Sequence, residues 1–305
     1  MEPIGRIDLR ARIIEIALES LQPLERDVPS LKLKRLHAIA LDRQGDLLHE
    51  QGKGAAALDA YRAALAIRTA LMDSDPENPE WVLAAAKSHE NIGAVLQDRV
   101  NGRLAAQEAY QDSLNLLERL ADRFPGNPTW LNELAHGHAQ VGLFHAQQRN
   151  LDEALAAFRK ALDVDTRLAA GDAENTEYQS NLSEDHENMG SVFLEQGKKD
   201  EALEALGTAV DIARRVVEKD PTSATARRDL SKRNDERSRA FLAWGLLASA
   251  VIGYRESLEI ATRLCEEDPA NTEYQRDLSL SYSSLGSTLL EDGQLHEAHE
   301  SCQTA

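Results

Sequence analysis

One feature constrains this chain more than any other: its residues repeat with a period of 48. Glycine, replaced once by serine, returns at steps of 48 or 49 residues at Gly45, Gly93, Gly142, Gly190, Ser238 and Gly286. A largely aromatic column keeps these steps at Tyr61, Tyr110, Phe158, Leu206 and Tyr254, and alanine stands four residues before each of them. Repeats of about 20 to 50 residues are typical of stacked arrays, in which each unit buries its apolar side against its neighbours.

The residue pattern within each repeat predicts two helices. Apolar and small residues recur at steps of three and four, which is the period of one helix face. Asn78-Pro79 and Asn127-Pro128 predict helix starts, because asparagine caps free amides and proline suits the first helical position. We therefore predict an all-α fold of six antiparallel hairpins, over residues 31–73, 79–123, 127–170, 176–219, 223–267 and 271–305.

Residues 1–30 precede the array as a helix and a linker. The helix is predicted over residues 6–22, with an apolar face formed by Ile7, Ile13, Ile14, Ala17, Leu18 and Leu21. An array needs a cap over its end, so we expect this helix to cover the first hairpin. All nine prolines then fall in the N-terminal segment or in the joints, outside the predicted helices.

The columns resemble those of the tetratricopeptide repeat family over about residues 31 to 305. The second hairpin shows them as His89, Ile92-Gly93, Leu96, Ala106, Tyr110 and Ser113. The resemblance implies a right-handed α-solenoid. The family's usual unit is about 34 residues, so this chain looks like the long-helix variety often seen in bacterial multidomain proteins.

Composition and charge narrow the functions. A net charge of −18 repels phosphate, so we expect no nucleic-acid binding. No apolar run reaches the roughly 18 residues that a membrane span needs. Two cysteines in 305 residues fit a reducing cytoplasm.

We find no residues arranged for catalysis. The chain lacks Gly-x-Ser-x-Gly, and Cys265 and Cys302 fall in packing columns. His296 and His299 could share a helix face, but no further ligands are identifiable, so we expect no metal site and no cofactor. His145 stands in an otherwise apolar column, as a core histidine or as a pH-sensitive or ligand-contacting one.

The resemblance also implies that the first helices of the hairpins line a groove for a partner segment. The predicted groove residues are Asp42, Arg43, Lys87, Glu90, Asn91, Asp98, Gln140, Glu184, Glu187, Asn188, Lys232, Asp235 and Arg239. Asn91 and Asn188 match the family's backbone-gripping asparagine, although a solvated helix face is the alternative. Carboxylates outnumber cations here, so we predict a protein or peptide partner with a basic or amphipathic segment. Glu90 and Glu187 argue against a clamp for a terminal carboxylate.

The fifth hairpin departs from the pattern, because residues 240–254 carry no charge. We predict an apolar contact surface for self-association or for an adjoining domain, formed by Phe241, Trp244, Leu246, Leu247, Val251 and Ile252. Deep local packing is the alternative. The function predicted overall is a non-catalytic scaffold or adaptor. A sensory or regulatory repeat domain of a larger signalling enzyme, with its effector domain outside this chain, is the second reading.

Overall fold

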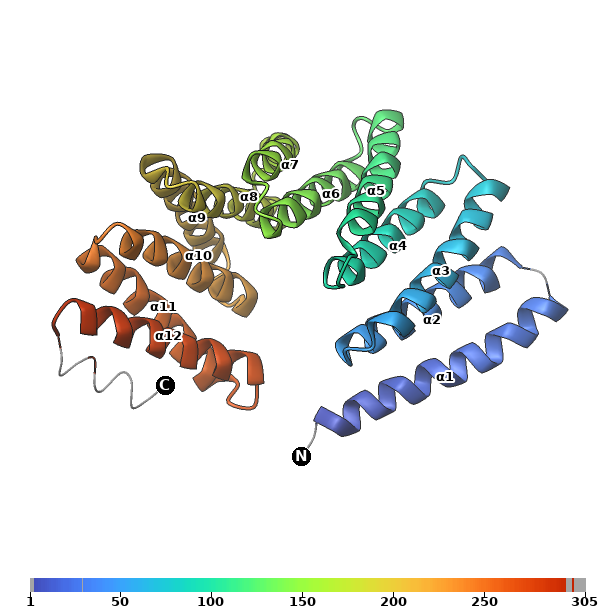
Figure 1. Cartoon of the computed structure of the whole chain (residues 1–305), viewed down its shortest axis with the longest axis horizontal. Helices are drawn as coiled ribbons and strands as arrows, with labels where there is room; N and C mark the ends of the chain where they lie inside the picture. The colour runs from blue at the N-terminus through green and yellow to red at the C-terminus, as the bar shows by residue number, and fades with distance from the viewer. Residues whose placement is uncertain (1–2, 29, 295–297, 299–305) are drawn as a thin grey trace. The chain divides into compact units, whose positions relative to one another are not determined.

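The computed structural model describes residues 3–28, 30–294 and 298. Across them, the regular structure is helical throughout and forms an all-α repeat solenoid (Figure 1). The helices are α1 Pro3–Asp27, α2 Leu31–Glu50, α3 Gly54–Ser74, α4 Pro79–Gln97, α5 Arg103–Arg123, α6 Pro128–Gln147, α7 Leu151–Gly171, α8 Thr176–Glu195, α9 Lys199–Lys219, α10 Ala224–Ala243, α11 Leu247–Glu267 and α12 Thr272–Glu291.

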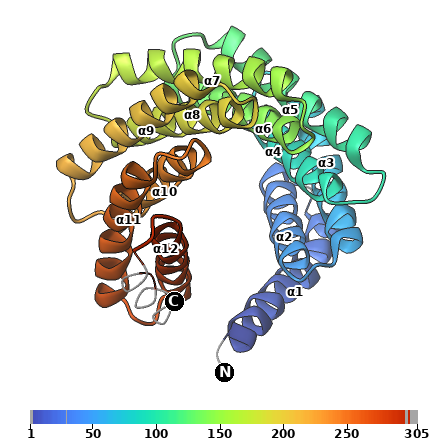
Figure 2. The ribbon, with the colours of Figure 1, turned by 60° about the vertical axis from the view of Figure 1, so that its left-hand side comes forward.

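From α2 onward, the even-numbered helices are the first helices of their hairpins. They begin 48 or 49 residues apart, and α2, α4, α8 and α10 each pack against the helix that follows, as α10 does against α11 (Figure 2). The sequence predicts one uninterrupted array, whereas the chain divides into two compact units, residues 1–144 and 145–305. The division falls within α6. A uniform repeat cannot reveal such a boundary, because every repeat carries the same columns.

Asparagine or serine fixes the start of the first helices. The side-chain oxygen of Asn78 accepts from the Glu80 amide at 3.0 Å, and that of Asn127 accepts from the Thr129 amide at 2.9 Å. Both predicted caps are therefore confirmed. Asn175, Ser223 and Asn271 cap α8, α10 and α12 in the same way. These caps satisfy amides that have no partner within the helix.

The glycine and aromatic columns meet inside the first two hairpins. A Cβ added at Gly45 would lie 2.5 Å from the ring of Tyr61, and one added at Gly93 would lie 3.0 Å from that of Tyr110. The alanines of the small column, such as Ala57, are fully buried. Glycine therefore lets the second helix lay a large side chain directly on the backbone of the first helix.

In the fifth hairpin, the glycine stands on the second helix and the larger residue stands on the first helix. Ser238 replaces the glycine of α10, and Gly253 of α11 stands where the other second helices carry an alanine such as Ala60. A Cβ at Gly253 would lie 2.1 Å from the hydroxyl oxygen of Ser238. The first helix gains a side chain at Ser238 and the second helix loses one at Gly253, so the two helices still approach each other closely.

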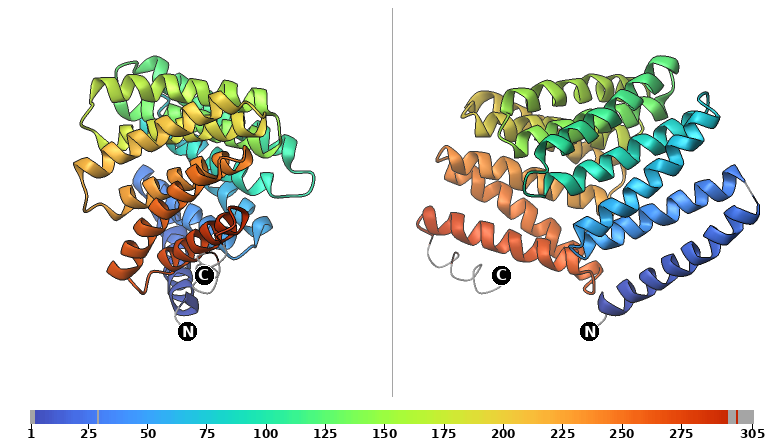
Figure 3. Two further views of the ribbon diagram at one scale, coloured as in Figure 1. Left: turned by 90° about the vertical axis from the view of Figure 1, so that its left-hand side faces the viewer. Right: turned by 45° about the vertical axis from the view of Figure 1, so that its right-hand side comes forward.

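The N-terminal helix differs from its prediction in two ways. α1 continues to Asp27 and contains Pro23, so the expectation that it ends at residue 22 and that no helix contains a proline is wrong. α1 packs against α2 (Figure 3), and this tertiary support outweighs the local cost of the proline. Arg10 also pairs with Glu50 of α2 at 3.0 Å.

The outer face of α1 is not the polar surface that caps an array. Ile13, which the sequence assigns to the covered side, is 58% exposed. Leu9 and Ile16 lie on the same stripe and are 62% and 49% exposed. The residues that face α2, such as Leu18 and Leu21, are partly buried.

Candidate functional site

A repeat position in the middle of the first helices faces solvent in all six of them and forms what we call the exposed row. Its members are Ile39, Lys87 and His136 in the first unit and Glu184, Lys232 and Leu280 in the second. They follow one another at the repeat period, so they occupy equivalent places on their helices. Ile39 is 39% exposed and Leu280 is 57% exposed, so the row includes apolar side chains open to a partner.

The predicted groove contains only part of this row. It includes Lys87, Glu184 and Lys232 but not the apolar Ile39 and Leu280, because charged side chains are the usual mark of a solvent-facing position. The repeat period would have found them, because they lie 48 residues from Lys87 and Lys232 respectively.

The carboxylates of the predicted groove do not face solvent. Asp42, Glu90, Glu187 and Asp235 share one repeat position, three residues after the exposed row, and all four are partly buried. A side chain three residues further along the helix points toward the neighbouring helices. The prediction of an open acidic groove is therefore wrong at these four positions.

Asp42 is neutralised by an arginine from the second helix of its own hairpin. Arg68 of α3 forms an ion pair with Asp42, and its Nη1 donates to Ser88 Oγ of α4 at 2.5 Å. The side chains of Arg68 and Asp42 are 8% and 16% exposed. Burial raises the pKa of Asp42, while Arg68 acts to lower it. One guanidinium thus joins α2, α3 and α4.

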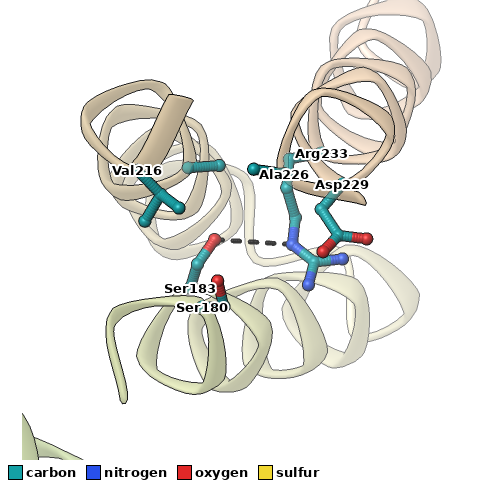
Figure 4. Close-up of a pocket in the computed structure, with 7 residues that line it drawn as sticks. Ser180, Ser183, Val216, Ala226, Asp229 and Arg233 are labelled. Carbon is teal, nitrogen blue, oxygen red and sulfur yellow. Dashed lines mark hydrogen bonds between the residues drawn. The ribbon is translucent and has the colours of Figure 1, made fainter. Parts of the chain in front are cut away.

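Glu187 is neutralised by an arginine from the next hairpin. Arg233 of α10 pairs with Glu187 of α8, and its Nε donates to Ser183 Oγ at 3.4 Å (Figure 4). Ala213 and Val216 of α9 line the space that this side chain occupies. Burial, with Glu184 and Glu236 nearby, raises the pKa of Glu187 to about 7 against the effect of Arg233.

The other two carboxylates of this position use neutral partners. Glu90 Oε1 accepts from Ser113 Oγ of α5 at 3.1 Å, and burial raises the pKa of Glu90. Burial also raises the pKa of Asp235 to about 6, partly offset by a hydrogen bond from Ser257 of α11. Glu90 and Asp235 therefore link neighbouring helices. Because both are partly buried, they do not offer surface charges that a partner could recognise.

A further buried acid joins α7 and α8. Asp185 is 2% exposed, and burial together with the neighbouring Asp165 raises its pKa to about 9. The carboxyl of Asp185 is therefore protonated at neutral pH, which lets two carboxyl groups share a hydrogen bond. The sequence columns do not single out Asp165 and Asp185, because the packing of one hairpin on the next is needed to show that the two positions meet.

The exposed charges of the predicted groove are largely balanced within the chain. Lys87 lies 2.7 Å from Glu133, and Arg43 and Arg239 pair with Asp46 and Glu236, each three residues away on the same helix. The exposed members are four cations, Arg43, Lys87, Lys232 and Arg239, and two carboxylates, Asp98 and Glu184. The excess of carboxylates that predicted a basic partner is thus absent from the solvent-facing set.

The two predicted peptide-gripping asparagines lie one turn beyond the exposed row. Asn91, Gln140 and Asn188 are all partly buried. Nδ2 of Asn188 is buried without a hydrogen-bond partner, so its amide is turned away from solvent. Asn91 stays a candidate for gripping a peptide, whereas Asn188 would need to rotate its amide.

The uncharged stretch of the fifth hairpin is mainly core. Val251 is 4% exposed, and Phe241 packs against the same cluster as Val251, Tyr254 and Leu289. The predicted contact surface is therefore wrong for Phe241 and Val251, because the helices flanking the turn bury them. Trp244 and Leu247 are partly buried. Leu246 and Ile252 are 36% and 59% exposed, and a contact through them stays a prediction.

The histidine column is set among packed residues. His89 and His186 are partly buried, and burial lowers the pKa of each; His138 is 5% exposed. His145 is partly buried. In the part of the chain that the structure describes, no three histidine, cysteine or carboxylate side chains are placed to hold a metal ion. His296, His299 and Cys302 lie outside the described residues.

None of the described helices is both long and apolar enough to cross a membrane. The recurring contacts described above are glycine against an aromatic ring within hairpins and a buried polar group between hairpins. Such contacts are typical of protein families in which helices stack in a repeating array.

Two models of the tetratricopeptide repeat match the sequence, one over residues 4–79 and 99–173 and the other over residues 187–222. The chain belongs to the tetratricopeptide repeat family. The first match begins inside α1, so this helix already follows the family pattern. Curated protein sequences give no match.

Two solved structures share the fold of this chain. BtubC (BKLC) from P. vanneervenii is 15% identical, with a TM-score of 0.63 over 81% of this chain and 87% of that chain. The apo form of RapI is 15% identical, with a TM-score of 0.56 over 95% of this chain and 78% of that chain. At this identity the likeness shows the fold alone.

Proposed function

We propose that the protein is a non-catalytic interaction scaffold whose two units each bind a segment of a partner protein along the exposed row of their first helices. The observation that carries the proposal is the row itself. Side chains of apolar, cationic and acidic character stand open at one repeat position, while the neighbouring positions are used for packing. A surface of this kind offers separate contacts along an extended segment rather than one closed pocket.

The partner segment is expected to be amphipathic rather than strongly basic. Ile39 and Leu280 offer apolar contact, whereas the exposed cations already have carboxylates nearby. Exposed ion pairs are worth only about 0 to 1 kcal/mol and are screened by salt. We therefore expect affinity to fall only modestly as salt rises.

A library of random peptides displayed on phage tests the row directly. Peptides selected on the wild-type chain are tested against a row variant, Lys87→Asp with Lys232→Asp. The control variant, Arg119→Asp with Arg215→Asp, makes the same charge change at exposed positions on the second helices α5 and α9. We expect the row variant to weaken binding and the control variant to leave it unchanged. Equal binding by both variants would reject the row as the site.

A further inference from the structure

α1 carries an apolar stripe that the rest of its unit leaves exposed. Leu9, Ile13 and Ile16 are 62%, 58% and 49% exposed. These residues are spaced by four and three, so they lie along one face of the helix. Large apolar side chains gathered in this way usually mark a contact surface.

The repeat register shows what this face is. Moving back 48 residues from α3 places Ala57, Tyr61 and Ala64 at residues 9, 13 and 16. In α3 those three side chains are at most 3% exposed. The equivalent residues of every later second helix are also buried: Ala106, Tyr110, Ser113, Ala154, Phe158, Ala161, Ala202, Leu206, Ala209, Ala250, Tyr254 and Ser257.

In the other hairpins, this stripe is the one that meets the first helix of the same hairpin. Tyr61 lies on the backbone of Gly45, and Leu206 lies on that of Gly190, where added Cβ atoms would be 2.5 Å and 2.6 Å away. Tyr61 Oη also donates to Asp46 Oδ1 of α2 at 2.8 Å. The stripe of α1 thus stands at the place of an interface that the chain builds repeatedly, with the larger Leu9 and Ile16 where α3 carries Ala57 and Ala64.

The neighbouring face of α1 is already in use. Ile14, Leu18 and Leu21 are partly buried on the side where α1 packs against α2. This is the contact that a second helix makes with the following hairpin, as α3 makes with α4. α1 therefore stands as a second helix, with its forward face packed and the face for a first helix open.

We infer that α1 binds an amphipathic helix of a partner protein, in the position that a first helix takes in the other hairpins. The partner helix is expected to carry glycine, alanine or serine opposite Ile13, with apolar residues on either side. This chemistry follows from the pairing rule of the hairpins, in which a large side chain meets a glycine or serine of the first helix. Close helix approach requires that match of volumes.

The same rule argues against a second copy of α1 as the occupant. Two such stripes facing each other would set isoleucine and leucine against isoleucine and leucine. None of the contacts of this stripe described above pairs two large side chains in that way. A partner helix with a small residue at its centre fits the stripe, and a second stripe of bulky residues does not.

A synthetic peptide of residues 79–98, labelled with a fluorophore at its N-terminus, is a suitable probe, because it carries a first-helix face around Gly93. Its binding to the full chain is followed by fluorescence anisotropy. We expect saturable binding that Ile13→Asp weakens about tenfold or more, because the charge removes the apolar contact. Leu104→Asp is the matched control, since Leu104 is 74% exposed on another helix, and it should leave binding unchanged.

Two further measurements keep the inference falsifiable. A Gly93→Leu version of the peptide should bind at least about tenfold more weakly to the unaltered chain, since the small residue is lost. Light scattering reports the mass of the chain without peptide. The inference is overturned by absent saturable binding, by equal affinity for the Ile13→Asp variant or for the Gly93→Leu peptide, or by a wild-type dimer that Ile13→Asp dissociates. That last outcome would assign the stripe to a second copy.

Discussion

Arg68 and Arg233 each neutralise a buried carboxylate, but they reach it from different helices. The carboxylates they neutralise, Asp42 and Glu187, stand at one repeat position of α2 and α8. Arg68 reaches its carboxylate from the second helix of the same hairpin, whereas Arg233 reaches from the first helix of the next hairpin. Each also contacts a serine hydroxyl, on Ser88 or Ser183.

The register explains how both arrangements are possible. Arg68 and Ala213 share one repeat position, and Ser88 and Arg233 share another. At each junction one position holds the arginine and the other holds a small residue that makes room for it. At these two junctions the arginine can therefore stand at either position, whereas the junction between α7 and α8 carries Asp165 and Asp185 at the same two positions.

The two junctions differ in the state of their carboxylate. Acidic neighbours Glu184 and Glu236 help to raise the pKa of Glu187 to about 7, so it is partly protonated near neutral pH. Burial and Asp46 raise the pKa of Asp42 as well, against Arg68 and Arg43. Because the pKa of Glu187 reaches about 7, we expect the hairpin-four junction to depend less on its arginine than the hairpin-one junction does.

The largest expected effect is the loss of Arg68. Arg68→Met should lower the free energy of unfolding by about 3 to 5 kcal/mol at pH 7.5, because it leaves a buried carboxylate without its counter-charge. Arg233→Met should cost less, about 1 to 3 kcal/mol, since Glu187 can bind a proton instead. Urea denaturation followed by circular dichroism measures both. Equal losses would show that the two junctions are electrostatically equivalent.

The pH dependence of stability sharpens the same comparison. The pKa of Glu187 is raised to about 7 in the folded chain from an ordinary value of 4.5, so the folded state binds its proton more tightly. Its stabilising effect is complete below about pH 4.5 and is lost as the pH rises to about 7. Relative to Glu187→Gln, the wild type should lose roughly 2 to 3 kcal/mol across this window.

Glu187→Gln removes a single carboxyl, so groups common to both proteins cancel in the difference. Asp185, whose pKa is raised to about 9, titrates at higher pH and would not produce the same window. A flat difference between wild type and Glu187→Gln from pH 4.5 to 7 would contradict the raised pKa of Glu187.

A transplant of the arginine tests whether the two junctions are interchangeable. Arg68→Ala with Ser88→Arg gives the first junction the residues of the fourth one. The double variant should recover about 2 kcal/mol of the stability that Arg68→Ala loses, because an arginine at 88 can reach Asp42 as Arg233 reaches Glu187. Urea denaturation of the single and double variants decides this. Additive losses would show that the helix spacing at this junction does not admit the second arrangement.

Much of the fold could be predicted from the sequence, because the repeat columns are local and regular. The starts of α4 and α6 at Asn78 and Asn127 follow from the sequence, because an N-cap is a local signal. The contact of Tyr110 with Gly93 inside the hairpin does not, because a column along the chain does not tell whether its ring lies within a hairpin or between hairpins. The side chains of the candidate site were harder to predict. Glu90 and Glu187 are charged, and charge suggests solvent, yet a position three residues beyond the exposed row lies between helices.

The remaining differences also have a physical origin. Ser238 looked like a defect in the glycine column, because a single column does not show the opposing residue on α11. Val251 and Phe241 looked like surface, because uncharged sequence fits a buried hairpin end as well as an exposed contact. In both cases the deciding fact is a contact between two helices, which the pattern along one helix cannot contain.

The exchanged glycine and serine of hairpin five, Gly253 and Ser238, predict a smaller change in the free energy of unfolding. Gly253→Ala should cost about 1 to 2 kcal/mol, because the new methyl group meets the hydroxyl of Ser238 in a packed crossing. Adding Ser238→Gly should restore stability to within about 0.5 kcal/mol of wild type, as it recreates the arrangement of the other hairpins. Thermal unfolding of the three proteins tests the pairing. No recovery in the double variant would mean that the two positions are not coupled.

The smallest expected effect sets the scale for the buried arginines. Arg263 and Glu259 form an i, i+4 pair on α11 at 2.5 Å, but their side chains are 66% and 65% exposed. Water and salt screen such a pair, so Arg263→Met should change the free energy of unfolding by less than about 0.5 kcal/mol. The substitution matches Arg68→Met and Arg233→Met in chemistry and differs from them in burial. If urea denaturation gave Arg263→Met a loss as large as theirs, the cost would come from losing an arginine anywhere on these helices, and the buried junctions would have no special role.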